Sequence, residues 1–107
     1  MLPLLLATVA ASPLTPVGVG EREWRISAYR ESVKRGRVVF NIHNYGEDDH
    51  NLQVVGPSGY KSAITPDIKP DENGTLRTQL LKRGTYKLLC VKPGHVAKGM
   101  RTTIRVR

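Results

Sequence analysis

Apolar and polar residues alternate along several short segments of this chain, and this period of two constrains its fold more than any other feature. Val38, Phe40 and Ile42 occupy alternate positions, and so do Leu76, Thr78 and Leu80. Such alternation is typical of β-strands that bury one face. Strands are predicted at residues 24–28, 38–44, 50–55, 75–81, 85–90 and 101–107, with a weaker one at 60–64. The segments between them are short and turn-like and none has a helical period, so we expect an all-β sandwich or barrel.

Two longer segments lack this alternation and are predicted to be loops. Residues 65–74 contain Pro66 and Pro70, and residues 91–99 contain Pro93, Gly94 and Gly99. Proline and glycine of this density interrupt regular structure. The second loop joins two predicted strands, in which Tyr86, Leu88 and Cys90, and then Thr102, Ile104 and Val106, are expected to face the core.

The first 20 residues differ from the rest, because all 17 basic and 9 acidic residues lie in residues 21–107. The apolar run from Leu2 ends in Val9-Ala10-Ala11, which fits a signal peptide cleaved before Ser12. No Lys or Arg precedes the run, so an uncleaved anchor and a structural N-terminal strand are the alternatives, although the run is too short to span a bilayer. We expect residues 1–20 to be a signal peptide or apolar leader, flexible over residues 14–20, and residues 21–107 to form one domain.

The net charge of +8 is large for 107 residues. It favours solubility, or attraction to an acidic partner or an anionic membrane. Aromatic residues are few and no basic helix or recognised motif is present, so a nucleic-acid partner is not expected.

The stretch from Cys90 to Met100 contains the residues most indicative of function. Cys90, His95 and Met100 are separated by four residues in each gap, and Cys90 is the only cysteine, so the chain has no intramolecular disulfide. Thiolate, imidazole and thioether ligands suit copper, and two histidines with one cysteine and a weak axial methionine form the blue-copper arrangement. His50, at the start of a predicted strand after a polar loop, is the best second histidine. His43 lies late in a strand and is predicted not to be a ligand.

These residues resemble the cupredoxin family over most of residues 22–107. The resemblance rests on the strand start His50-Asn51-Leu52, the approach Gly84-Thr85-Tyr86-Lys87-Leu88-Leu89-Cys90, and the loop to Met100. The equal gaps are similar to those of rusticyanin and auracyanin. The resemblance implies a cupredoxin-like Greek-key β-sandwich that binds one copper ion through His50, Cys90, His95 and Met100. It also implies that Asn51 ties the two ligand loops together.

The same resemblance implies an electron carrier. His95 would be the exposed ligand edge, within a small apolar patch formed by Pro93, Gly94, Val96 and Ala97. We expect Lys92 and Lys98 beside this patch to steer a redox partner that is acidic or membrane-bound. The acidic run at residues 47–49 is expected to be a solvated loop, or, if it lies close to the metal, to favour Cu(II).

Alternatives remain for the same ligands. A copper-binding or copper-delivery module without an electron-transfer role, or an accessory domain of a metal-uptake system, would use them equally well. A purely structural sandwich would leave the Cys90, His95 and Met100 spacing to chance. An enzyme with several copper centres is not expected, because the chain has only three histidines. We therefore expect a monomeric carrier that is exported to the periplasm or cell exterior, or anchored to a membrane.

Overall fold

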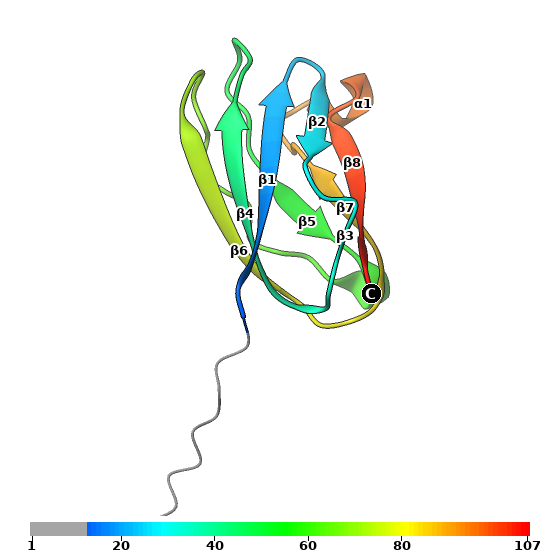
Figure 1. The fold of residues 1–107 in the computed structure, drawn as a ribbon. Helices are drawn as coiled ribbons and strands as arrows, with labels where there is room; N and C mark the ends of the chain where they lie inside the picture. The colour runs from blue at the N-terminus through cyan, green and yellow to red at the C-terminus, as the bar shows by residue number, and fades with distance from the viewer. Residues whose placement is uncertain (1–12) are drawn as a thin grey trace, which may run out of the picture.

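The structure, a computed structural model, describes residues 13–107 as two four-stranded β-sheets that pack face to face (Figure 1). The strand order is β2-β1-β4-β6 in one sheet and β3-β8-β7-β5 in the other. The first sheet comprises β1 (Thr15–Arg22), β2 (Arg25–Ala28), β4 (Gly36–Asn44) and β6 (Asn73–Leu80). The second comprises β3 (Ser32–Val33), β5 (Gln53–Val55), β7 (Gly84–Leu89) and β8 (Arg101–Val106). The predicted all-β sandwich is confirmed.

The core lies between the sheets and follows the predicted alternation. Phe40 and Ile42 of β4 and Leu80 of β6 are buried from one sheet, and Tyr86 and Leu88 of β7 from the other. Thr78 is also buried, and its hydroxyl donates to the Val38 carbonyl at 2.8 Å. Burying each large apolar side chain contributes about 1.5–3 kcal/mol relative to exposure. The inward faces of β4, β6, β7 and β8 were therefore predictable from the alternation of apolar and polar residues alone.

The expectation of a flexible leader at residues 14–20 is wrong, because Thr15–Arg22 forms β1 in the middle of the first sheet. β1 pairs in parallel with β4, from Thr15 opposite Val38 to Glu21 opposite Asn44, and antiparallel with β2. Val17 and Val19 are buried in the core. The folded domain thus includes residues before 21. The predicted signal peptide and its cleavage before Ser12 fall on residues 1–12, which lie outside the described residues.

The glycines of β1 explain why its sequence did not read as a strand. A Cβ at Gly18 would lie 2.6 Å from Tyr29 Cδ2, and one at Gly20 would lie 2.8 Å from the Tyr29 hydroxyl and 3.2 Å from Tyr45 Cε2. Glycine in a strand often marks such a close approach. Gly18 and Gly20 therefore leave space for the two tyrosine rings within a regular strand, and they do not mark a flexible segment.

Four smaller boundaries also differ from expectation. The predicted strand at 60–64 does not form, because these residues contain only an isolated bridge between Lys61 and Val55, after a one-turn helix η1 (Pro57–Gly59). The strand predicted from residue 50 is regular only in β5, and β6 begins at Asn73, inside the predicted loop. The loop at 91–99 contains one helical turn, α1 (His95–Lys98). Residues 13–107 include no helix long and apolar enough to cross a membrane.

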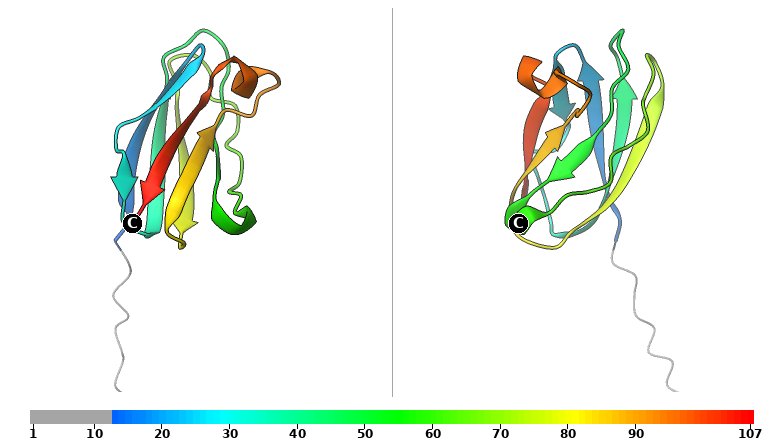
Figure 2. Two further views of the ribbon diagram at one scale, coloured as in Figure 1. Left: turned by 90° about the vertical axis from the view of Figure 1, so that its right-hand side faces the viewer. Right: turned by 180° about the vertical axis from the view of Figure 1, so that it is seen from behind.

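Three connections meet at the end of the sandwich opposite the C-terminus (Figures 1 and 2). They are the β1–β2 turn, the loop that follows β4, and the β7–β8 connection that carries α1. This end brings together segments that are far apart in the sequence, and it holds the site described next.

Candidate metal centre

His50, Cys90 and His95 place one ligand atom each within 4.8 Å of one another. His50 Nδ1 lies 3.3 Å from His95 Nδ1 and 3.7 Å from Cys90 Sγ, and His95 Nδ1 lies 3.4 Å from Cys90 Sγ. His50 and Cys90 are fully buried, whereas His95 is partly exposed. Three of the four residues predicted from the sequence therefore converge on one point.

The backbone fixes the position of each residue. The His50 amide donates to the Ile68 carbonyl at 3.1 Å, and the Ile68 amide donates to the His50 carbonyl at 2.7 Å. Cys90 directly follows β7, and its amide donates to the Met100 carbonyl at 3.2 Å. These bonds tie the His50 segment to the loop at Ile68 and the two ends of the Cys90–Met100 loop to each other.

Met100 closes the ligand loop. Its side chain is buried in the core cluster, and its amide donates to the His95 carbonyl at 3.1 Å. Gly99 before it has φ of +126°, a region that favours glycine, and a Cβ there would lie 2.8 Å from the Trp24 carbonyl oxygen. The loop thus returns to the core at Met100. A bond from its thioether to a metal stays a prediction.

Asn51 connects the two ligand segments. Its backbone amide donates to Cys90 Sγ at 3.4 Å, and its side-chain oxygen accepts from the Val91 amide at 2.8 Å. The expectation that Asn51 ties the two ligand loops together is therefore confirmed. A donor aimed at the sulfur helps to set the electronic character of a metal-bound thiolate.

Burial governs the protonation of the cluster. It raises the pKa of the Cys90 thiol, against hydrogen bonds from the Asn51 and Lys92 backbones that act in the other direction. Burial also lowers the pKa of His95, and the nearby His50 imidazole lowers it further. At neutral pH the metal-free cluster therefore holds a thiol and a neutral His95 imidazole. Metal uptake would release the Cys90 proton, because the thiolate is the ligand.

Two residues of the site were missed by the sequence analysis, and both lie in the β1–β2 turn. Glu23 Oε1 lies 3.1 Å from His50 Nε2. The Trp24 ring packs edge-on against His95 with centroids 4.9 Å apart, and Lys98 Nζ lies 4.3 Å from the Trp24 ring centroid. No motif in the sequence marks this turn, because its role arises only from the contact of β1 and β2 with the ligand loops.

Glu21 is a buried acid near this end. Its side chain is fully buried, and neither carboxylate oxygen has a hydrogen-bond partner within residues 13–107. Burial raises its pKa to about 8. When ionised, the Glu21 carboxylate would also raise the pKa of Cys90 through its negative charge. Glu21 therefore holds its proton at neutral pH, which avoids the large cost of an unpaired buried charge.

His43 lies apart from the cluster, as predicted. Its Nδ1 lies 2.6 Å from Asn73 Oδ1 and its Nε2 lies 3.2 Å from Asp71 Oδ1. Its ring also packs against Tyr45, with centroids 4.3 Å apart. These contacts occupy both ring nitrogens on the side of β4 away from the core.

The charged residues around the site differ in part from expectation. Lys92 Nζ forms an ion pair with Asp67 Oδ2 at 2.7 Å, and this hydrogen bond raises the Lys92 pKa. Lys92 is thus engaged within the chain and does not simply flank the patch. The acidic loop lies next to the site through its backbone, since the Glu47 and Asp48 amides donate to Glu23.

The donor set fits copper better than other common metals. Two imidazole nitrogens and one sulfur, with a buried methionine closing the loop, match the ligands of blue-copper sites. Three donors at these separations can face a single ion once the Cys90 thiol has lost its proton.

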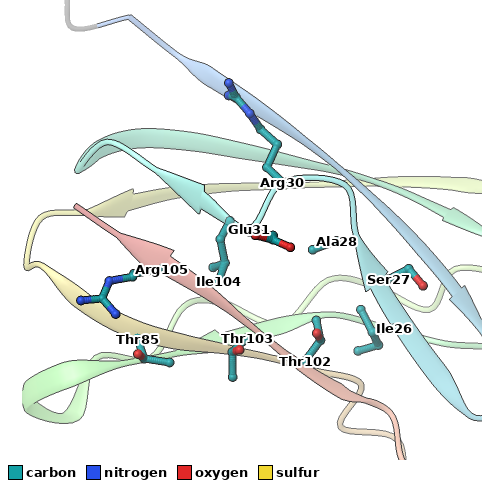
Figure 3. Close-up of a pocket in the computed structure, with 10 residues that line it drawn as sticks. All are labelled: Ile26, Ser27, Ala28, Arg30, Glu31, Thr85, Thr102, Thr103, Ile104 and Arg105. Carbon is teal, nitrogen blue, oxygen red and sulfur yellow. The ribbon is translucent and has the colours of Figure 1, made fainter.

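The groove shown in Figure 3 lies elsewhere on the molecule. It has a volume of about 630 Å³ and runs between β2 and β8, where Ser27 and Ala28 face Thr102 and Thr103 and where Arg30, Glu31 and Arg105 add charge. None of the three clustered ligands lines it. The metal centre is therefore not the floor of this groove.

Solved structures with the same fold include three auracyanins. The auracyanin of Roseiflexus castenholzii superimposes with a TM-score of 0.70 at 22% identity, covering 91% of this chain and 98% of that chain. Auracyanin B gives 0.75 at 20% identity, covering 90% and 91%. Auracyanin A of Chloroflexus aurantiacus, described as a "blue" copper protein, gives 0.74 at 18% identity, covering 89% and 100%. These likenesses confirm the fold that the resemblance implied.

A curated relative, a blue copper protein of Pisum sativum, is 34% identical over 67 residues. The match covers 62% of this chain and 35% of the relative, so the chain spans about a third of that protein's length. No family model matches the chain.

Proposed function

We propose that this chain, a member of the cupredoxin family by its fold and ligand pattern, holds one copper ion and carries single electrons between partner proteins. The observation that carries the proposal is the convergence of His50 Nδ1, His95 Nδ1 and Cys90 Sγ within 4.8 Å. Copper, when bound, supplies a Cu(I)/Cu(II) couple whose potential depends on the axial ligand and the surroundings of the sulfur. The buried Met100 is the proposed axial ligand.

The chain's own residues would keep the donors in one arrangement in both oxidation states. His50 is held between Ile68 and Glu23, and Cys90 between Asn51 and the Met100 backbone. Donors that are fixed on a packed core move little when the charge of the site changes. A small rearrangement favours rapid electron transfer, which supports a carrier.

His95 is the proposed point of electron entry and exit. It is the one member of the cluster with an exposed edge, whereas His50 and Cys90 are fully buried. Pro93, Gly94 and Ala97 are exposed neighbours of His95 in the same loop, and they offer a small contact surface. A partner that docks there would approach the site without reaching the sulfur.

The burial of Cys90 also supports a carrier over a copper-delivery module. Delivery proceeds by exchange of ligands with a second protein, and an incoming ligand would find the Cys90 thiol and the His50 ring covered. An enzyme with further copper centres lacks support, because His43 is the third and last histidine and is hydrogen-bonded elsewhere.

Titration of the purified chain with Cu(II), followed by visible absorption and electron paramagnetic resonance, tests the proposal. We expect one equivalent to bind and an intense thiolate-to-copper band to appear. Cys90→Ser should remove this band, and Met100→Leu should keep it while shifting the reduction potential. A wild-type chain that stays colourless would contradict the proposal.

We further propose a monomer whose partner is acidic or membrane-bound. The net charge of +8 supports this, since charge complementarity mainly raises the association rate. Lys98 is the better test position, because Lys92 already pairs with Asp67. Lys98→Glu should slow electron transfer to an acidic redox protein at low salt, and an unchanged rate and salt dependence would contradict the idea.

Export is proposed as well, to the periplasm or the cell exterior. The apolar run of residues 2–11 supports it, and the predicted cleavage before Ser12 would leave β1 whole. The mass of the chain recovered from the producing cells tests this. A cytoplasmic product that retains residues 1–11 would contradict it.

A further inference from the structure

Glu23 makes direct contact with the ring of a proposed copper ligand, on the side away from the other ligands. Its Oε1 lies 3.1 Å from His50 Nε2, while His50 Nδ1 lies 3.3 Å from His95 Nδ1 and 3.7 Å from Cys90 Sγ. The two nitrogens of one ring therefore face two different groups. One faces a carboxylate, and the other faces the donors of the metal centre.

The carboxylate itself is held firmly in place. The Glu47 amide donates to both of its oxygens, at 3.0 and 3.1 Å, and the Asp48 amide donates to Oε1 at 2.7 Å. The loop can approach this closely because residue 46 is glycine, since a Cβ there would collide with the Glu23 carboxylate. Glu23 therefore clamps the loop that leads into His50 as well as the ring of His50.

These contacts also mark Glu23 as a hydrogen-bond acceptor. Both of its oxygens receive backbone N–H bonds from Glu47 and Asp48, and Oε1 also lies 3.1 Å from His50 Nε2. A carboxylate that already accepts at both oxygens accepts from the His50 nitrogen as well, so Nε2 carries the proton. The other nitrogen, Nδ1, is then the one with a free electron pair.

Histidine ligands commonly donate their second ring N–H to a carboxylate, which fixes the tautomer and makes the ligand more basic. A carboxylate also adds negative charge beside the site. Both effects favour the more highly charged oxidation state of a bound metal. The acidic run at residues 47–49 holds Glu23 through its backbone amides, and Glu23 of the β1–β2 turn is the carboxylate in contact with a ligand ring.

We propose that Glu23 is a positioning residue of the metal centre, which accepts the Nε2–H of His50, keeps Nδ1 unprotonated toward Cys90 and His95, and favours Cu(II) over Cu(I). This proposal rests on the proposed copper-binding function. Its first half concerns the chain alone and is testable without metal.

The first experiment is nitrogen-15 NMR of the His50 ring in the metal-free full chain. We expect the wild type to hold the Nε2–H tautomer. Glu23→Gln, whose amide oxygen still accepts, should retain that tautomer, and Glu23→Ala should give a mixture. A wild type that carries its proton on Nδ1 would overturn the proposal, and so would a Glu23→Ala variant that folds and keeps the wild-type tautomer.

The second experiment measures the reduction potential of the copper-loaded chain. Mutation of a residue that hydrogen-bonds to a metal ligand typically costs roughly 10- to 100-fold in metal affinity. If the affinity of Glu23→Gln falls by that factor for Cu(II) and stays the same for Cu(I), the reduction potential rises by about 60–120 mV. Glu31→Gln is the matched control, since it removes the same charge from an exposed position beside the groove of Figure 3. An equal shift in the two variants, or none in Glu23→Gln, would overturn the role in favouring Cu(II).

The two proposals fail in different ways. If the wild type binds no copper, the proposed function fails, while the tautomer measurement still decides whether Glu23 orients His50. If the wild type forms the blue site and Glu23→Gln leaves its potential unchanged, the function stands and Glu23 has no part in tuning it. Because Glu23→Gln is nearly isosteric, it tests the charge even if Glu23→Ala does not fold.

Discussion

The chain contains two His-Asn dipeptides, and they serve different purposes. In both, the asparagine is buried and hydrogen-bonded to the backbone of another segment. The histidines differ, because His50 is fully buried and faces Cys90 and His95, whereas the side chain of His43 is 27% exposed and bonded to Asn73 and Asp71. The same pair of residues thus builds a metal centre in one region and an outer-face contact in the other.

Strand geometry explains the difference. His43 lies inside β4, where successive side chains point to opposite faces, and Ile42 before it occupies the core. His43 must therefore face outward. His50 follows a polar loop and bridges Ile68, so the alternation of β4 no longer governs it. The position of a histidine relative to a strand end decides whether it can reach the metal centre.

The asparagines differ in what they connect. Asn44 Nδ2 donates to the Asp48 and Ile68 carbonyls, each at 2.8 Å, and its Oδ1 accepts from the Gly46 amide at 2.8 Å. Asn44 thus shapes the loop that leads into His50. Asn51 instead reaches across to the Cys90 segment. One dipeptide supports the entry to the site, and the other supports the site itself.

The largest expected effect separates the two histidines. His50→Ala should weaken Cu(II) binding by more than the roughly 100-fold that mutation of a residue hydrogen-bonded to a ligand can cost, because it removes a ligand itself. His43→Ala should leave the affinity and the blue band unchanged and cost less than about 1 kcal/mol of stability. Competition titration against a chelator of known affinity measures both. Equal losses of Cu(II) affinity in the two variants would show that the two histidines do not differ in this role.

A smaller effect concerns Glu21, which lies opposite Asn44 in the sheet register and whose carboxylate has no hydrogen-bond partner among the described residues. Its pKa is about 8 in the folded chain, against an ordinary value of 4.5. Between these values the folded chain retains a proton that the unfolded chain has lost. Stability should therefore fall as pH rises through this interval, by up to about 1.4 kcal/mol per pH unit.

Urea unfolding of the metal-free chain from pH 5 to pH 9 measures this dependence. Glu21→Gln should flatten it, and the difference between variant and wild type isolates Glu21 from Cys90, whose pKa is also raised. Parallel curves for the two chains would show that Glu21 finds a partner in solution.

The smallest expected effects are those of replacing the two asparagines, Asn44 and Asn51. Asn44→Ala removes three hydrogen bonds and leaves the buried Ile68 carbonyl with one donor fewer, which should cost about 2–3 kcal/mol. Asn51→Ala removes one side-chain bond, to the Val91 amide, and should cost about 1 kcal/mol. Asn51→Ala should nevertheless be the variant that shifts the thiolate-to-copper band. Denaturant unfolding and visible spectra of both variants decide this, and the reverse order would refute the division of roles.

Much of the fold and of the metal centre was predictable, and the errors share one cause. The alternation in 38–44, 75–81 and 101–107 was sufficient to assign inward faces, and the Cys90–Met100 spacing was sufficient to locate the ligand loop. β1 was missed because Gly18 and Gly20 resemble a linker until Tyr29 and Tyr45 are seen to pack over them. Lys92 was expected to flank the contact patch and steer a partner, because Asp67, with which it pairs, is distant in sequence.

The sequence by itself determined the features that depend on neighbouring residues, which are the strand faces, the turns and the spacing of Cys90, His95 and Met100. Only the tertiary structure decided which distant groups meet, because strand pairing across two sheets places side chains together that no local period relates. That is how His50 came to face Cys90 while His43 did not, and how Glu23 of the β1–β2 turn came to lie 3.1 Å from the His50 ring.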